Sequence, residues 1–177
     1  MRVALTGTPG TGKTTVADLL ETDLEVVHLN DVIREEGLTE SIDEERESLV
    51  ADLDAVRSWL DGYGPGHGGL LVESHLAHLF DADRVVVLRC APGDLERRLL
   101  DRGETERKAR ENAESEALDA ILSEAVERHG EDSVYEIVTT DRSPGAVARA
   151  VGAVLAGERA PNAGTVDYTD WLVGGPQ

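Results

Sequence analysis

The chain has 177 residues, 40% of them hydrophobic but only 3% aromatic, and a formal net charge of −19. Its length suits a single domain, its one cysteine excludes an internal disulfide or a multi-cysteine zinc site, and its acidity argues against a broad basic patch for nucleic acid. No stretch approaches the ~20 apolar residues that span a membrane, and the first apolar run is too short for a signal peptide, so we expect a cytoplasmic monomer.

Short apolar runs alternate with helical patterns in the first half of the chain. In chain order, the predicted elements are a strand at Arg2–Thr6, a helix at 14–21, a strand at 24–29, a helix at 41–60, a glycine-rich loop at 63–69 and a strand at Leu70–Glu73. The helix at 41–60 has apolar residues at i, i+4, i+7 and i+11, and Ser41 and Glu44 form a capping box at its start.

The second half continues the alternation. The predicted elements are a strand at Arg84–Arg89, a short helix at 94–101, a long acidic helix at about 105–129, a strand at Val134–Val138 and a last helix that ends near Gly157. The core stripe of the long helix is Leu118, Ile121, Leu122 and Ala125. Ser143 caps the last helix, with Pro144 at its first position. This order predicts an α/β fold: a five-stranded parallel sheet flanked by helices.

The residues from 158 to 177 contain Pro, Gly and Asn and show no periodicity. We expect one domain at 1–157 followed by a loosely ordered C-terminal tail. Tyr168 and Trp171 are the two side chains in this tail that could dock it onto the domain.

Residues 7–14, Gly-Thr-Pro-Gly-Thr-Gly-Lys-Thr, match the phosphate-binding pattern G-x-x-x-x-G-K-[ST] without a mismatch. The residues expected to bind ATP through this loop are Gly10, Thr11, Gly12, Lys13, Thr14 and Thr15. Glycines let successive N–H groups point at phosphate oxygens, and Lys13 can reach the β- and γ-phosphates. The Thr14 hydroxyl can bind Mg²⁺, and Thr15 can meet the α-phosphate. The alternative, a chance glycine turn, fits poorly with a strand before and a helix after the loop.

The pattern alone does not choose among kinases, GTPases and mechanical ATPases. A GTPase needs an Asn-Lys-x-Asp element, and neither Lys13 nor Lys108, the only lysines, follows an Asn. A motor ATPase is usually longer. A small kinase remains.

The segment Asn30-Asp31-Val32-Ile33-Arg34 resembles the Gly-Asp-x-x-Arg element of adenylate kinases, with Asn in place of Gly. The resemblance implies that Asp31 and Arg34 bind AMP, since a guanidinium can grip a monophosphate with two hydrogen bonds. The alternative is that Arg34 is a solvated helix residue beside acidic neighbours.

Glu73-Ser74-His75 resembles the Asp-x-His of the adenylate kinase isoenzyme 6 family, P-loop nucleoside monophosphate kinases linked to small-ribosomal-subunit maturation, with Glu for Asp. The resemblance makes Glu73 and His75 catalytic residues. Glu73 would hold Mg²⁺ through water, and His75 would orient water or phosphate. The alternatives are a strand-end ion pair for Glu73 and a satisfied polar residue for His75.

The run from Leu95 to Gly103 is also typical of these kinases, and its Arg-Gly marks the start of a short lid. The resemblance implies that Arg102 contacts ATP. Lys108 and Asn112 resemble the Lys…Asp-Asn lid pattern, and Lys108 could neutralise the transferring phosphate, although a charged helix face is an equal alternative.

The resemblance implies a kinase that uses ATP and Mg²⁺ to phosphorylate AMP and that also has ATPase activity. It also implies an acceptor region at about 30–60 and a lid at about 102–112. A second hypothesis is a ribosome-assembly ATPase that binds a small-subunit ribosomal protein, and a third is a kinase for another small acceptor.

The charge balance sets one more expectation. The chain has 36 acidic and 17 basic residues, and 15 of the basic residues are arginines. An acidic chain poor in lysine and aromatics resembles proteins of a high-salt cytoplasm, where salt screens the self-repulsion.

Overall fold

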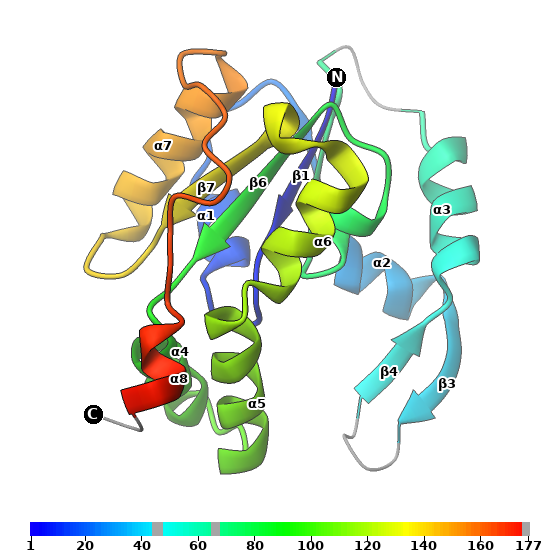
Figure 1. Cartoon of the computed structure of the whole chain (residues 1–177). Coiled ribbons are helices and arrows are strands. Elements are labelled where there is room, and N and C mark those ends of the chain that lie inside the picture. The colour runs from blue at the N-terminus through cyan, green and yellow to red at the C-terminus, as the bar shows by residue number, and fades with distance from the viewer. Residues whose placement is uncertain (44–47, 65–67, 175–177) are drawn as a thin grey trace.

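The computed structural model describes residues 1–43, 48–64 and 68–174, and its centre is a five-stranded parallel sheet (Figure 1). The strands are β1 (Arg2–Thr6), β2 (Glu25–His28), β5 (Leu70–Glu73), β6 (Arg84–Arg89) and β7 (Val134–Val138), in the order β2-β5-β1-β6-β7. Near-continuous apolar runs form them because helices cover both faces of the sheet. The predicted five-stranded parallel sheet is confirmed.

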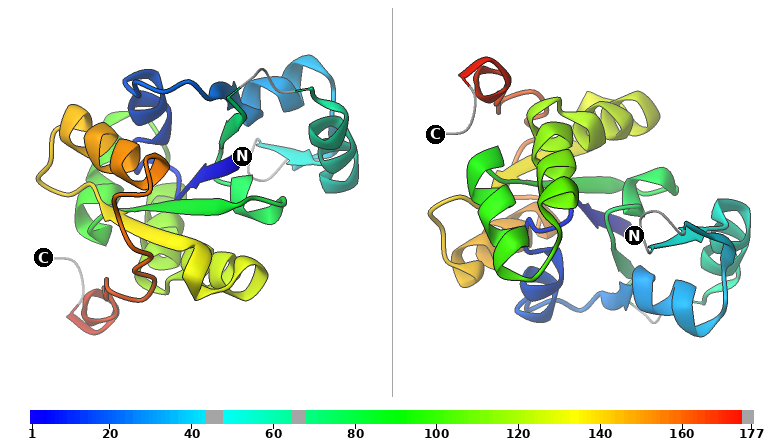
Figure 2. Two further views of the ribbon diagram at one scale, coloured as in Figure 1. Left: turned by 90° about the horizontal axis from the view of Figure 1, so that it is seen from above. Right: turned by 90° about the horizontal axis from the view of Figure 1, so that it is seen from below.

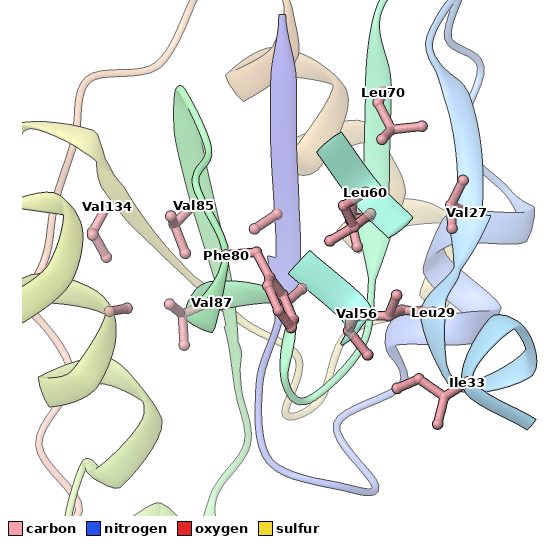
Figure 3. Close-up of a cluster of buried hydrophobic side chains, with 14 of the residues drawn as sticks. Val27, Leu29, Ile33, Val56, Leu60, Leu70, Phe80, Val85, Val87 and Val134 are labelled. Atoms are coloured by element: carbon pink, nitrogen blue, oxygen red, sulfur yellow. The ribbon is translucent and has the colours of Figure 1, made fainter. Parts of the chain in front are cut away.

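The two faces of the sheet carry separate cores, and the strand residues alternate between them. Ala4 and Val72 pack into one core, whereas Val3, Leu5 and Leu71 pack into the other. The first core, shown in Figure 3, lies against α2 (Leu29–Glu35), α3 (Leu53–Gly62) and α6 (Ala120–His129). The second lies against α1 (Lys13–Asp18) and α7 (Pro144–Leu155), on the opposite face (Figure 2).

Two of the flanking helices follow the predicted start and stop signals. The last long helix, α7, begins with Pro144 and is capped by the Ser143 hydroxyl, which accepts a hydrogen bond from the Ala146 N–H at 3.2 Å. The short helix α4 (Pro92–Asp101) also begins with a proline, two residues before its predicted start. The Ser143 cap therefore fixes where α7 begins, whereas α4 begins at its proline without a side-chain cap.

The predicted helix at 41–60 is wrong in its first half. Residues in this half form an antiparallel hairpin of β3 (Thr39–Asp43) and β4 (Ser48–Ala51), and α3 starts only at Leu53. Asp52 caps α3 by accepting a hydrogen bond from the Ala55 N–H at 2.9 Å. Ser41 is therefore a strand residue and not a helix cap, and Glu44 lies outside the described residues. A true capping residue just before the apolar stripe decides where the helix begins.

The predicted helix at about 105–129 is two helices. α5 (Glu106–Ala117) ends at Leu118, Asp119 adopts a left-handed backbone with φ 54°, and α6 then begins at Ala120. Leu118, predicted in the core stripe, is instead 61% exposed. The break is held by Asp119, whose carboxylate accepts a hydrogen bond from buried Arg89.

The segment after α7 runs back along β7 and ends in α8 (Asp170–Gly174). The N–H of Asn162 donates to the carbonyl of Val134 at 3.2 Å, and the Trp171 ring lies 4.2 Å from the Arg110 guanidinium. These contacts place residues 159–171 against β7 and α5.

The remaining elements are short. Residues 77–79 and 131–133 form the 3₁₀ turns η1 (Ala77–Leu79) and η2 (Glu131–Ser133). Within the predicted glycine-rich loop at 63–69, residues 65–67 lie outside the described part. In the part of the chain that the structure describes, no helix has the length and apolar character needed to cross a membrane.

Candidate active site

The loop between β1 and α1 wraps around a space at the carboxyl edge of the sheet. Gly7, Gly10 and Gly12 all have positive φ, at 142°, 92° and 93°. A Cβ on Gly10 would lie 2.9 Å from side-chain carbons of Leu95 and Leu99, so α4 packs directly on the loop. The motif thus adopts the curled backbone that its glycines predict.

Lys13 is the first residue of α1 and only 7% exposed. Its Nζ donates to the carbonyls of Gly7 and Thr8 at 2.8 and 3.1 Å, so the side chain folds over its own loop. The pKa of Lys13 is lowered to about 8, chiefly by burial and to a lesser extent by Arg102, against the opposing effect of Glu73 and Glu116. Phosphate oxygens in place of the two carbonyls would favour the charged amine.

A cavity of about 270 Å³ opens on one side of the loop, where α4 and α7 face each other. It is lined by loop residues Gly10, Thr11, Gly12 and Thr15, and by Val16, Arg98, Arg102, Thr139, Arg142, Pro144 and Val147. The combination of loop N–H groups, three arginines and an apolar wall suits a nucleotide, whose base can pack on the apolar wall while its phosphates contact the N–H groups and arginines.

A second cavity of about 180 Å³ lies over the other end of the loop. It is lined by Pro9, Gly10, Gly12, Lys13, Thr14, Thr15, Asn30, Glu73, His75 and Arg102. The fold therefore brings Lys13, Thr14, Glu73 and His75 together, as expected from the sequence. Arg102 lines both cavities, because it ends α4 directly above the loop.

Glu73 ends β5 and belongs to a chain of polar contacts. One of its carboxylate oxygens contacts His28 Nδ1 at 2.9 Å, and His28 Nε2 lies 3.3 Å from Asp18. The hydrogen bond to Glu73 raises the pKa of His28, and the two carboxylates beside the ring favour its charged form. His28 therefore fixes the orientation of Glu73 at the edge of the second cavity.

The donor set at this edge suits a hard cation. Thr14 supplies a hydroxyl and Glu73 a carboxylate, and the second Glu73 oxygen makes no hydrogen bond to a described residue. Across the described part of the chain, no three His, Cys, Asp or Glu side chains gather as a metal site. Two protein oxygens fit Mg²⁺, which keeps several waters and takes phosphate oxygens as ligands.

His75 lies two residues beyond β5, between the second cavity and a third one of about 590 Å³. Burial, with Lys13 nearby, lowers the pKa of His75 to about 4, so its ring is neutral at pH 7. The ring makes no hydrogen bond to any described residue. A neutral, unpaired imidazole can hydrogen-bond to a water or a phosphate oxygen.

The third cavity brings the predicted lid residues close to His75. Lys108, Glu111 and Asn112 of α5 line it together with Glu104, which precedes α5, and Leu99 near the end of α4. Lys108 Nζ lies 3.8 Å from the Glu104 carboxylate, and Asn112 donates to the Lys108 carbonyl at 2.8 Å. Lys108 is thus a cation on the same cavity as His75, held by a weak ion pair.

Asp31 and Arg34 lie apart from these cavities. They sit one helical turn apart on α2 and form an ion pair with each other, and the Arg34 side chain is 62% exposed. Their neighbour Asn30 does line the second cavity, and its amide oxygen accepts a hydrogen bond from the Ser74 hydroxyl at 2.8 Å. The sequence pattern treated Asn30 only as a replacement for Gly.

A buried ion network lies behind the loop. Arg89, 1% exposed at the end of β6, contacts the carboxylates of Glu116, Asp119 and Glu136. The Thr8 hydroxyl donates to Glu116 at 2.5 Å, which ties the phosphate loop to this network. Charges this deeply buried need partners, and here each partner comes from a different element.

Residues 3–119 match the family described as "AAA domain". Relatives named "Putative adenylate kinase" align over nearly the whole chain. The relative from Natronomonas pharaonis is 64% identical and the one from Halobacterium salinarum is 61% identical, each over 97% of this chain and 100% of the relative. The relative from Methanosarcina acetivorans is 42% identical over 96% of this chain and 98% of the relative. The chain belongs to this adenylate kinase-like family of P-loop proteins.

Solved structures share the fold of this family member. Shikimate kinase from Bacteroides thetaiotaomicron has a TM-score of 0.56 with 18% identity, over 88% of this chain and 98% of that one. A sulfotransferase from Alicyclobacillus acidocaldarius has a TM-score of 0.59 with 14% identity, over 95% and 86%. The α/β P-loop NTPase fold predicted from the sequence is confirmed.

Several site residues of this family member escaped sequence reasoning. Arg142 lines the first cavity and Glu116 holds the loop, yet neither lies in a recognised motif. Arg98 also lines that cavity, and it lies in the run from Leu95 to Gly103 without a site role having been expected for it. Glu136 offered the clearest signal, because a lone carboxylate in the middle of a buried strand requires a charged partner.

Proposed function

We propose that the protein is an Mg²⁺-dependent nucleoside monophosphate kinase, most specifically an adenylate kinase that converts ATP and AMP to two ADP. The observation that carries the proposal is the position of Arg102. It lines both cavities that meet over the phosphate loop, where a cation can contact a triphosphate along its length. The names of the close relatives point to the same activity.

The first cavity is the proposed donor site. The base of ATP would lie between Arg98, Arg142 and the apolar wall of α7, with its phosphates on the loop. The N–H groups of the curled loop and the Lys13 amine would then replace the internal contacts that Lys13 makes with Gly7 and Thr8.

The second cavity is the proposed site of phosphoryl transfer. Phosphoryl transfer asks the protein mainly to align two anions and neutralise the charge that spreads over the phosphoryl oxygens. Lys13 and Arg102 already border this space, and Lys108 borders the neighbouring one. Thr14 and Glu73 would hold Mg²⁺, which would offset the negative charge of the phosphates.

Neutral His75 has a separate role in this proposal. Because its ring is uncharged at pH 7 and borders both the second and the third cavity, it would orient the acceptor phosphate or a water and not add positive charge. The residues at about 102–112 would act as a lid that excludes water when both nucleotides are bound.

The acceptor would be gripped from the region at about 30–60. Among the described residues Arg34 pairs with Asp31 alone, on the helix surface, so a monophosphate can take the place of that carboxylate at little cost. α2 lies between the sheet and the β3–β4 hairpin (Figure 1).

The test is ADP formation by purified protein with ATP, Mg²⁺ and each nucleoside monophosphate in turn. We expect AMP to accelerate ADP formation far more than any other acceptor. In Arg34→Ala we expect the KM for AMP to rise about tenfold or more while ATP hydrolysis without acceptor is retained. Arg97→Ala is the matched control, because Arg97 is an exposed arginine outside the region at 30–60 and pairs with Asp94 in the same i, i+3 manner. Equal losses of both activities in Arg34→Ala would remove Arg34 from the acceptor site.

A second candidate function is a nucleotide-switched ATPase in small-ribosomal-subunit maturation, with a small-subunit ribosomal protein as partner. The Glu73-x-His75 element favours it, because an unpaired neutral imidazole beside the transfer site can position water as well as an acceptor. ATP hydrolysis that no monophosphate accelerates, together with retention of a ribosomal protein in a pull-down, would support this function over the kinase. Strong acceleration by AMP without ribosomal-protein retention would reject it.

A further inference from the structure

The buried network behind the phosphate loop has two carboxylates that are used in the same way. Glu116 accepts from Arg89 Nε at 2.8 Å with one oxygen and from the Thr8 hydroxyl with the other. Glu136 accepts from Arg89 with one oxygen and from the backbone N–H of Thr165 at 2.7 Å with the other. One arginine therefore bridges the phosphate loop to the C-terminal segment.

The loop end of this bridge controls the catalytic lysine. Thr8 is 2% exposed, and its carbonyl accepts hydrogen bonds from Lys13 Nζ at 3.1 Å and from the Thr11 hydroxyl at 2.9 Å. Because the Thr8 side chain is fixed by Glu116, any shift of Glu116 moves a carbonyl that holds Lys13.

The other end of the bridge is held by several contacts with residues 159–168. Asn162 accepts from the Glu136 N–H at 3.0 Å and donates to the Glu136 carbonyl at 3.1 Å, so it fixes both sides of that strand residue. The Thr165 hydroxyl and the Val166 N–H donate to the Glu136 carboxylate at 3.1 and 3.3 Å. The Tyr168 ring then covers Arg89, 5.4 Å from its guanidinium carbon.

Arg89 therefore binds both Glu116, on the side of the phosphate loop, and Glu136, on the side of the C-terminal segment. Three carboxylates surround one guanidinium, so the position of the guanidinium depends on how each carboxylate is held elsewhere. Undocking of residues 159–168 would expose the Glu136 carboxylate to water and allow Arg89 to shift relative to Glu116.

We propose that Glu116 and Arg89 are positioning residues that couple docking of the segment 159–168 to the shape of the phosphate loop. The C-terminal segment is then part of the nucleotide site in energetic terms, although it lines none of the cavities over the loop. ATP binding and segment docking favour each other, and by linkage each must strengthen the other equally. The proposal rests on the proposed ATP site.

The first experiment measures ATP affinity of the full-length chain by calorimetry. Thr8→Val removes the hydroxyl that donates to Glu116 but keeps every charged side chain of the network, and we expect ATP to bind roughly tenfold more weakly, whereas Thr8→Ser keeps the hydroxyl and binds nearly as wild type. The double variant Asn162→Ala/Thr165→Ala loosens the segment far from the loop, and we expect about fivefold weaker binding. Thr169→Ala is the matched control, because among the described residues its hydroxyl contacts Asp167 alone.

The second experiment compares the wild-type chain with Thr8→Val by amide hydrogen exchange. Amide hydrogen exchange of Thr165 and Val166 should slow when ATP binds to the wild-type chain, and this slowing should be lost in Thr8→Val. A purely structural role for the network would change unfolding by urea but would not transmit ATP binding to these amides.

The outcomes separate the two proposals. ATP binding with unchanged Thr165 and Val166 exchange, and wild-type affinity in the double variant, overturns the coupling and leaves the kinase proposal standing. A wild-type chain that binds no ATP overturns both. Weaker ATP binding in Thr169→Ala equal to that of the double variant also contradicts the coupling, because it would reflect general loosening.

Discussion

At the scale of single residues, Lys13 is the side chain on which the proposed chemistry depends most. It is buried, borders the second cavity and has no other lysine near it in the sequence. We expect Lys13→Ala to lower kcat by at least about a hundredfold, since its charge acts on the developing phosphoryl charge. Steady-state kinetics with ATP and AMP measure this, and the urea unfolding midpoint checks that the fold persists. A kcat near that of wild type would contradict the central proposal.

The pH dependence of ATP binding follows from the same side chain. The pKa of Lys13 is lowered to about 8 in the free protein, so above pH 8 the amine is neutral there, while bound phosphates favour its charged form. ATP affinity should therefore be flat from pH 7 to 8 and fall up to about tenfold per unit above that, with uptake of a proton on binding. Calorimetry in two buffers of different ionisation enthalpy measures both.

Lys13→Arg provides the comparison, because a guanidinium stays charged throughout this range. Its ATP affinity should not depend on pH between 7 and 9.5. A wild-type affinity that is equally flat would mean that Lys13 is charged in the free protein.

Residue identities could be predicted from the sequence where spacing fixes the geometry. The phosphate motif determines its own backbone, so Lys13 and Thr14 could be placed without a structure. Arg142 and Glu116 could not, because they meet the loop only through the order of strands in the sheet. Glu73 and His75 were found through their resemblance to a family's Asp-x-His element, which lies at the end of the strand next to β1.

At the scale of elements, the break between α5 and α6 gives two leucines of similar sequence context very different burial. Leu118 is 61% exposed, whereas Leu122 is 6% exposed in the core against the sheet. Leu122→Ala should destabilise the fold by about 2–4 kcal/mol, and Leu118→Ala by less than about 0.5 kcal/mol. Urea unfolding of both variants measures this. Similar losses would mean that one continuous helix forms in solution.

The two errors in the predicted helices have a common cause. A helical apolar period continues in the sequence across 41–60 and across 105–129, but period alone does not locate helix ends. In the first case Asp52 caps α3 and so sets where that helix begins. In the second case Asp119 accepts a hydrogen bond from Arg89 and interrupts the helix. The first device is local and could have been found, whereas the second depends on a residue 30 positions away.

At the scale of the whole molecule, the net charge of −19 is the dominant property. Raising KCl from 0.1 to 2 M shortens the screening length from about 10 Å to below 3 Å, which relieves repulsion among the carboxylates. We therefore propose adaptation to high salt and expect the thermal unfolding midpoint to rise steeply over this range. A variant with several exposed Glu changed to Gln should show a shallower rise. A midpoint that does not increase with KCl would reject the adaptation.

The central position of β1 has a consequence for how the protein is made. β1 is the first strand to be synthesised, yet its two neighbours are β5 and β6, which begin about 70 and 80 residues later. β1 therefore remains unpaired in the nascent chain until residue 89 has emerged. Closing such long loops slows folding. The phosphate-binding turn, encoded first, is among the last features to acquire its shape.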